Sequence, residues 1–181
     1  MIDHAGEILI LTGPPGSGKT TTAEVLAAEP GSPKVHLHAD DFWHFIRHGA
    51  IPPYLPEAHR QNGVVMDVLG RTAATYAVGG YFVIVDGIIG PWFLAPFKTL
   101  QVPVRYVVLR PPLDVAIDRC RRRGGDTLTD LSTIAELHRQ FSSLGDLEGH
   151  TLPVGGHTKE MTAEAVIGAL ERPEFILVAG R

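Results

Sequence analysis

The chain has 181 residues, of which 44% are hydrophobic and 20% charged, a composition typical of one globular domain with a sizeable core. Sixteen Lys and Arg against 20 Asp and Glu give a formal net charge of −4, which makes nucleic acid or an anionic membrane an unexpected main partner. No apolar run approaches the roughly 18 residues of a membrane span, the opening MIDHAGE does not resemble a signal peptide, and the one cysteine suits a reducing compartment. We therefore expect a single cytoplasmic domain over residues 1–181, with its oligomeric state left open.

Apolar runs typical of strands alternate along the chain with segments of helical periodicity. The expected strands are residues 7–12, 34–39, 81–86, 104–109 and about 150–154. The expected helices are residues 19–29, 57–78, 113–123, 131–144 and 162–170, the last capped by Thr162. This alternation predicts an α/β three-layer sandwich around a parallel five-stranded sheet, in which ligands bind at the carboxyl ends of the strands.

The sequence GPPGSGKT follows the first expected strand directly and opens the first expected helix. It satisfies the pattern G-x-x-x-x-G-K-[ST] of a phosphate-binding loop (P-loop). Glycines let backbone N–H groups converge on phosphate oxygens, the helix adds the positive end of its dipole, Lys19 can reach the β- and γ-phosphates, and the Thr20 hydroxyl can bind Mg²⁺. We therefore expect ATP with Mg²⁺ here, although the sequence does not separate ATP from GTP. The expected nucleotide-binding residues are Gly13, Pro14, Pro15, Gly16, Ser17, Gly18, Lys19, Thr20 and Thr21.

Carboxylates end two of the other expected strands. Asp86 closes FVIVD and, together with Thr20, is the expected Mg²⁺ ligand, unless it only ends the strand beside Gly87. Asp40 and Asp41 follow the second strand, where a carboxylate beside the γ-phosphate can take the proton of an acceptor hydroxyl. We expect Asp40 to be this base and Asp41 a secondary partner, the alternative being that one of them caps a helix.

Arginines cluster in DRCRRRGGD, where Arg119 and Arg123 form an R-x-x-x-R pattern. Arginines at this place can stabilise a transferring phosphoryl group. The alternative is that they only form the solvated, basic end of a helix. The aromatic and basic segment 40–62 supplies Trp43 and Arg60 as expected acceptor contacts. The nine histidines are scattered and are not expected to form a metal site.

In size and layout the chain resembles the small P-loop kinases: the nucleoside monophosphate kinases, the shikimate and gluconate kinases and the chloramphenicol phosphotransferase-like group. The base-reading N-K-x-D element of GTPases is absent, because the one Asn, Asn62, is followed by Gly63. The resemblance implies the P-loop NTPase fold, an acceptor-binding segment over about 40–62, and a short arginine-rich lid over about 119–130. It also implies that the turn at 154–157 lies beside the adenine.

The sequence thus predicts an ATP-dependent kinase that transfers the γ-phosphoryl group to a hydroxyl of a small molecule, with Lys19, Asp40, Arg119 and Arg123 as catalytic residues. Two alternatives stay open. One is a nucleoside monophosphate kinase, whose phosphate acceptor needs no base, and the other is a non-catalytic nucleotide-binding or sensor protein. The identity of the acceptor is beyond the sequence.

Overall fold

The structure is a computed structural model that describes residues 2–123 and 130–177. Its strands are β1 (Ile8–Thr12), β2 (Lys34–His38), β3 (Phe82–Gly87), β4 (Val104–Arg110) and β5 (Thr151–Pro153). Its α-helices are α1 (Lys19–Ala28), α2 (Ala39–His44), α3 (His59–Val78), α4 (Ala95–Lys98), α5 (Leu113–Arg123), α6 (Leu131–Gln140) and α7 (Lys159–Leu170). Short 3₁₀ turns lie at Pro56–Ala58, Pro91–Phe93, Gly145–His150 and Pro173–Phe175.

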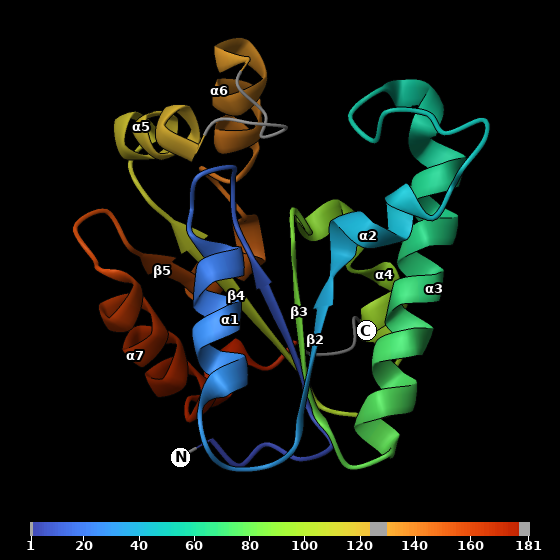
Figure 1. The fold of residues 1–181 in the computed structure, drawn as a ribbon, viewed down its shortest axis with the longest axis vertical. Coiled ribbons are helices and arrows are strands. Elements are labelled where there is room, and N and C mark those ends of the chain that lie inside the picture. Colours follow the sequence, from blue (N-terminus) through green and yellow to red (C-terminus); the bar gives the residue numbers. More distant parts are fainter. Residues whose placement is uncertain (1, 124–129, 178–181) are drawn as a thin grey trace.

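The strands form one five-stranded sheet in the order β2-β3-β1-β4-β5, and each neighbouring pair is parallel (Figure 1). The predicted α/β class and the parallel five-stranded sheet are therefore confirmed. Because the chain passes from β1 to β2 on one side and from β3 across β1 to β4 on the other, the direction of winding reverses at β1. A ligand site is expected at the carboxyl end of such a strand.

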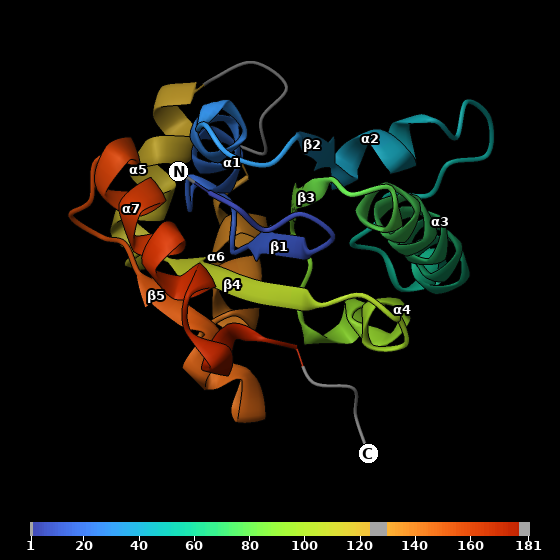
Figure 2. The same ribbon diagram turned by 90° about the horizontal axis from the view of Figure 1, so that it is seen from below.

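Both faces of the sheet are covered, with α1 and α7 on one side and α3 and α4 on the other (Figure 2). Side chains alternate along each strand, so β1 sends Ile8 and Ile10 into the core under α3 and Leu9 and Leu11 into the core under α1. All five β1 residues are buried, which explains why this strand is an unbroken apolar run.

Two element boundaries differ from expectation by more than two residues. The prediction that Thr162 caps the last helix is wrong, because α7 begins one turn earlier, where the Thr158 side chain accepts a hydrogen bond from the Met161 N–H. Thr162 instead lies in the first turn, where its hydroxyl donates to the Thr158 carbonyl. Helix α6 ends at Gln140 rather than 144, although Phe141 and Leu144 beyond it are still buried in the core.

Within residues 2–123 and 130–177, no helix has both the length and the apolar character needed to cross a membrane.

Candidate functional site

The P-loop lies at the carboxyl end of β1, where close packing leaves no space for side chains at two of its glycines. A Cβ at Gly13 would lie 2.2 Å from the Leu109 carbonyl oxygen, and one at Gly16 would lie 2.3 Å from that of Ala116. The loop therefore rests on β4 and on α5, and φ values of +149° and +75° at these glycines allow its tight path.

The loop ends at Gly18, the N-cap of α1, whose φ of 89° is left-handed. No side chain caps this helix and no acidic residue lies in its first turn. The first-turn N–H groups and the positive dipole end of α1 are therefore available to an anion outside the helix. This is the arrangement that binds phosphate.

Thr20 on α1 and Asp86 on β3 are brought together beside the loop. The Thr20 hydroxyl donates to Asp86 Oδ2 at 2.5 Å, and Asp86 is only 2% exposed. Burial by itself raises the pKa of the Asp86 carboxyl, but hydrogen bonds from His36 and Thr20 and nearby imidazole charge outweigh this, so the pKa lies below its ordinary value of 3.8. A carboxylate that stays ionised and a hydroxyl beside a phosphate cradle are the hard oxygen donors that suit Mg²⁺.

A cavity of about 280 Å³ adjoins the loop on the side of α5 and α7. It is lined by Gly16, Ser17, Gly18, Lys19, Thr20, Thr21, Thr22, Arg119, Cys120, His157, Thr158, Lys159 and Thr162. The Arg119 guanidinium reaches across it, with Nη1 and Nη2 each 3.4 Å from a carbonyl oxygen, those of Gly16 and His157. The cavity thus brings together the P-loop, the arginine helix and part of the turn expected at the adenine.

The other arginines of α5 do not share the position of Arg119. Arg122 is exposed and pairs with Asp118 one turn away, at 2.9 Å. Arg123 closes α5, but its side chain lies outside the described part of the structure, as do residues 124–129 of the expected lid. The role expected for Arg123 stays a prediction.

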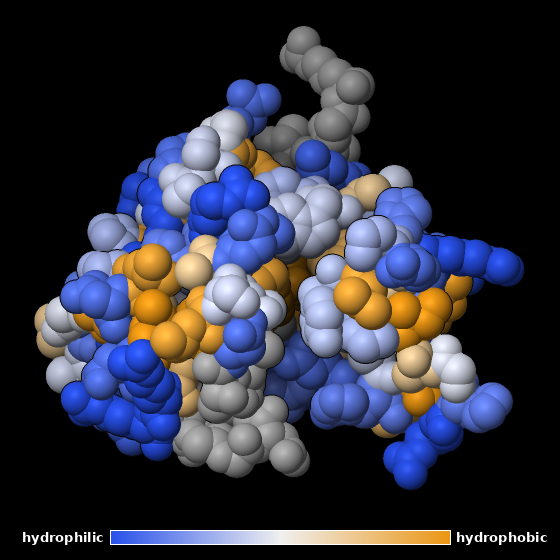
Figure 3. Space-filling view, turned by 90° about the horizontal axis from the view of Figure 1, so that it is seen from above, coloured by the Kyte–Doolittle hydropathy of each residue, from blue (hydrophilic) through white to orange (hydrophobic). Residues whose placement is uncertain are grey.

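A second cavity, of about 470 Å³, lies on the opposite side of the P-loop end of the sheet, between α2, α3, α6 and the segment 53–56. It is lined by Asp40, Trp43, Pro53, Tyr54, Leu55, Pro56, His59, Asn62, Ile88, Trp92, Phe93, Thr133, Leu137 and Gln140. We refer to it as the acceptor cavity. Apolar surface flanks a hollow at this end of the molecule (Figure 3).

The expected acceptor residues divide between the cavity wall and the outer surface. Asp40 and Trp43 line the acceptor cavity, whereas Asp41 and Arg60, both exposed, are absent from its lining. Neither aspartate caps α2, because His38 occupies the N-cap and makes no side-chain capping bond.

Asn62 forms hydrogen bonds that connect three walls of the acceptor cavity, namely α2, the segment 53–56 and α3. Its Oδ1 accepts from the Trp43 indole at 2.8 Å, and its Nδ2 donates to the Pro53 carbonyl at 2.8 Å. These bonds join α2 and the segment 53–56 to α3. The contribution of Asn62, and that of the α6 residues, was missed at the sequence level because no local pattern marks them.

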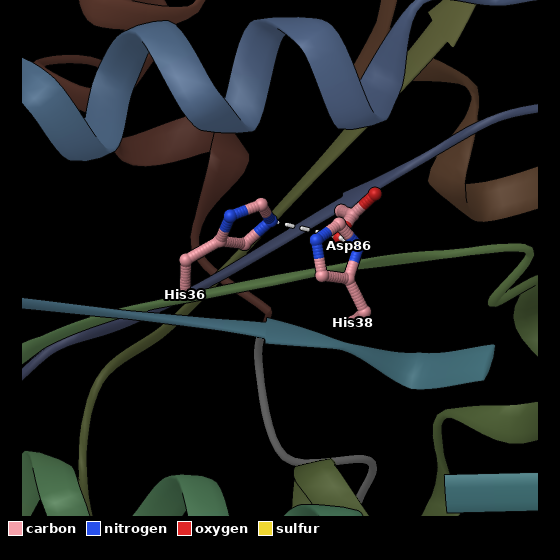
Figure 4. A group of neighbouring side chains, drawn as sticks. All are labelled: His36, His38 and Asp86. Atoms are coloured by element: carbon pink, nitrogen blue, oxygen red, sulfur yellow. Dashed lines mark hydrogen bonds and ion pairs between the residues drawn. The ribbon is translucent and has the colours of Figure 1, made fainter. Parts of the chain in front are cut away.

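Histidines complete the surroundings of Asp86. Imidazole nitrogens of His36 and His38 lie 2.8 and 2.9 Å from Asp86 Oδ1 (Figure 4). The expectation that no histidines gather into a ligand set is wrong for this pair, because they come together with Asp86. The H-x-H spacing could have shown that the two histidines share a face, since residues two apart on a strand do so, but not that this face meets Asp86.

The P-loop, the first helix without a side-chain cap and the paired oxygens of Thr20 and Asp86 together form the phosphate-binding arrangement of a P-loop protein. Residues 8–144 match the profile of the AAA domain family AAA_33, and the chain belongs to this family. None of the curated proteins matches it.

Solved structures share the fold at low sequence identity. Thymidylate kinase from Candida albicans superposes with a TM-score of 0.70 at 19% identity, over 92% of each chain. An unliganded sugar kinase from Janibacter sp. HTCC2649 gives 0.65 at 21% identity, over 93% of this chain and 95% of that one. A chain of the Pnkp1/Rnl/Hen1 RNA repair complex gives 0.58 at 21%, and there the match spans 77% of this chain but only 45% of the longer one. The resemblance to small P-loop kinases and the P-loop NTPase fold are thereby confirmed.

Proposed function

We propose that the protein is an ATP- and Mg²⁺-dependent kinase that phosphorylates a hydroxyl group of an uncharged, ring-bearing small molecule. The observation that carries this proposal is the lining of the acceptor cavity. Among the described residues it includes Asp40 but no Lys or Arg, and its walls contain four aromatic side chains, Trp43, Tyr54, Trp92 and Phe93. A phosphate acceptor is normally held by arginines, whereas aromatic walls suit the face of a ring.

The residues of the donor side hold and neutralise the triphosphate. The N–H groups of the P-loop and of the α1 N-terminus bind phosphate oxygens, and Lys19 bridges the β- and γ-phosphates. Thr20 and Asp86 would hold Mg²⁺, which when bound neutralises charge on the same phosphates. Arg119, whose guanidinium reaches from α5 to the Gly16 carbonyl, would add positive charge near the transferring group.

On the acceptor side, Asp40 performs the proton transfer. As the acceptor oxygen forms its bond to the γ-phosphorus, the bond from that phosphorus to the β–γ bridging oxygen breaks and ADP leaves. The proton of the acceptor hydroxyl passes to the Asp40 carboxylate. Because the transition state is loose, most of the rate enhancement comes from positioning and charge rather than from the base.

Structural relatives include both a sugar kinase and a thymidylate kinase, so the fold alone does not choose between a hydroxyl and a phosphate acceptor. The lining of the acceptor cavity favours an acceptor that reacts through a hydroxyl group. Arg60, the arginine expected to contact the acceptor through a phosphate or carboxylate, is not part of its lining.

The test is ADP release from Mg·ATP with a panel of nucleosides, nucleoside monophosphates, sugars, sugar acids, aminoglycosides and phenicols. Lys19→Ala serves as the blank, and Lys98→Ala on α4 is the matched control for loss of a lysine. We expect acceptor-dependent ADP release with an uncharged hydroxyl compound, lost in Lys19→Ala and kept in Lys98→Ala. Preference for a nucleoside monophosphate contradicts the hydroxyl proposal. ATP binding without ADP release for any acceptor contradicts the kinase proposal and favours a sensor.

A further inference from the structure

His36, His38 and Asp86 form a compact set of metal-binding atoms that the kinase reaction does not require. One nitrogen of each imidazole and one carboxylate oxygen lie within 4.8 Å of one another. The distances to Asp86 Oδ1 are 2.8 Å from His36 Nε2 and 2.9 Å from His38 Nδ1. The side chain of Asp86 is 2% exposed and that of His38 is 39% exposed, so the set is anchored in the protein and open on one side.

The sheet register places these three side chains together. On β2 the alternate residues Val35 and Leu37 pack into the core under α3, which directs His36 and His38 to the opposite face, that of α1. His38 is the register partner of Asp86, and β2 is directly paired with β3. Both imidazoles therefore reach Asp86 from the neighbouring strand (Figure 4).

We propose that His36, His38 and Asp86 bind a transition-metal ion of the Zn²⁺ class. Two imidazole nitrogens and one carboxylate oxygen are a ligand set that Zn²⁺ accepts, with a fourth position left for water. Ligands at about 2.0–2.1 Å in a tetrahedral site lie about 3.3 Å apart. The present separations of 2.8 and 2.9 Å from Asp86 Oδ1 need only a small widening to admit the ion, which would replace a proton on each of the two imidazole nitrogens.

The site differs from the expected Mg²⁺ site but shares one carboxylate with it. Mg²⁺ takes oxygen ligands and has little affinity for imidazole, so the two histidines select the softer ion. Asp86 Oδ2 is engaged by Thr20, while Oδ1 faces the histidines. If Asp86 holds Mg²⁺ during catalysis, as the proposed function requires, Zn²⁺ and Mg·ATP compete for the same side chain. Zn²⁺ is then an inhibitor of the enzyme.

The binding test uses the full chain, stripped of metal and free of nucleotide, with Co²⁺ as a spectroscopic probe. We expect the intense visible absorption of four-coordinate Co²⁺, saturating at one ion per chain and removed by one equivalent of Zn²⁺. His36→Ala and His38→Ala should each weaken Zn²⁺ binding by more than the about 10–100-fold that loss of a second-shell partner costs. His48→Ala is the matched control, because His48 is an exposed histidine of the loop after α2.

The proposal is overturned if Co²⁺ shows only the weak bands of the hydrated ion, or if all three variants bind Zn²⁺ as tightly as the unaltered chain. Circular dichroism establishes that each variant is folded. Because the His38 side chain is half-exposed, His38→Ala keeps the test decisive even if His36→Ala does not fold.

Competition is measured by titrating Zn²⁺ with and without Mg·ATP, with the His36→Ala/His38→Ala double variant correcting for Zn²⁺ held by the nucleotide itself. We expect Mg·ATP to weaken Zn²⁺ binding to the unaltered chain. If Mg·ATP leaves the Zn²⁺ affinity unchanged, the inference that the two ions share Asp86 is overturned. Both readouts are independent of ADP release. A chain that binds Co²⁺ through the histidines but phosphorylates nothing would refute the proposed function and leave the metal site standing.

Discussion

Two adjacent carboxylates at the start of α2 differ in what they face. Asp40 lines the acceptor cavity and Asp41 does not, although both are exposed. If Asp40 accepts the hydroxyl proton, Asp40→Asn should lower kcat by about 10²–10⁴-fold and leave KM for the acceptor within a few-fold. Steady-state ADP release with the acceptor found in the panel measures both constants.

Asp41→Asn is the matched control, since it removes the same charge one residue away and should change kcat only a few-fold. Equal losses in the two variants would mean that negative charge at the start of α2, rather than a proton transfer at Asp40, supports turnover. A phosphate acceptor would also leave Asp40→Asn nearly as active as the unaltered chain, because such an acceptor needs no base.

Single residues show what the sequence could and could not predict about the site. The P-loop was predictable because its chemistry lies in consecutive residues, read together with one strand and one helix. The meeting of His36 and His38 with Asp86 depends on the pairing of β2 with β3, which no local pattern gives. The sequence ranked Asp40 above Asp41 but gave no physical reason for the choice, because which of them faces the cavity depends on the phase of the six-residue helix α2.

At the scale of elements, the P-loop packs directly against α5. A Cβ at Gly16 would lie 2.3 Å from the Ala116 carbonyl oxygen, and Gly16 has a φ of +75°. Gly16→Ala should therefore lower the free energy of unfolding by more than the about 1–2 kcal/mol of a left-handed alanine and weaken ATP binding by displacing the loop from α5. Urea denaturation and nucleotide titration measure the two effects.

Gly63→Ala on α3 is the control for adding a methyl group. Nothing lies within 4 Å of a Cβ there, so this variant should be stabilised by about 0.5–1 kcal/mol, as expected for alanine in a helix interior. A Gly16→Ala chain as stable as the unaltered one would show that the loop and α5 separate easily.

Elements were predicted where periodicity was strong and were misplaced where two local signals competed. The buried strands β1 and β3 and the long helix α3 follow from continuous apolar runs and from helical spacing. The start of α7 was misplaced because Thr158 and Thr162 are both good capping residues, and only the backbone at 158, with a ψ of 172°, shows which of them caps the helix.

For the whole molecule, the reversal of winding at β1 separates two cavities that, in the proposed function, would serve opposite halves of the reaction. The nucleotide side is bounded by α1, α5 and the start of α7, and the acceptor side by α2, α3 and α6. Arg119 of α5 reaches the first cavity, while Thr133, Leu137 and Gln140 of α6 line the second. Helices α5 and α6 are consecutive and in contact. We therefore expect a ligand bound in one cavity to affect ligand binding in the other.

Nucleotide binding should therefore stabilise the entire fold and not only the loop, since the cavity beside the loop is lined by residues of the P-loop, α1, α5 and α7. A ligand that binds only the folded chain adds about 2.7 kcal/mol at 100 times its Kd. For a chain of this size each kcal/mol raises Tm by about 2–4 °C, so saturating Mg·ATP should raise Tm by about 5–10 °C. Differential scanning fluorimetry measures the shift, with Mg²⁺ alone as the reference. Lys19→Ala should lose most of the shift and Lys98→Ala should keep it. Equal Tm values with and without Mg·ATP in the unaltered chain would contradict the nucleotide site itself, on which every later step of the proposed reaction depends.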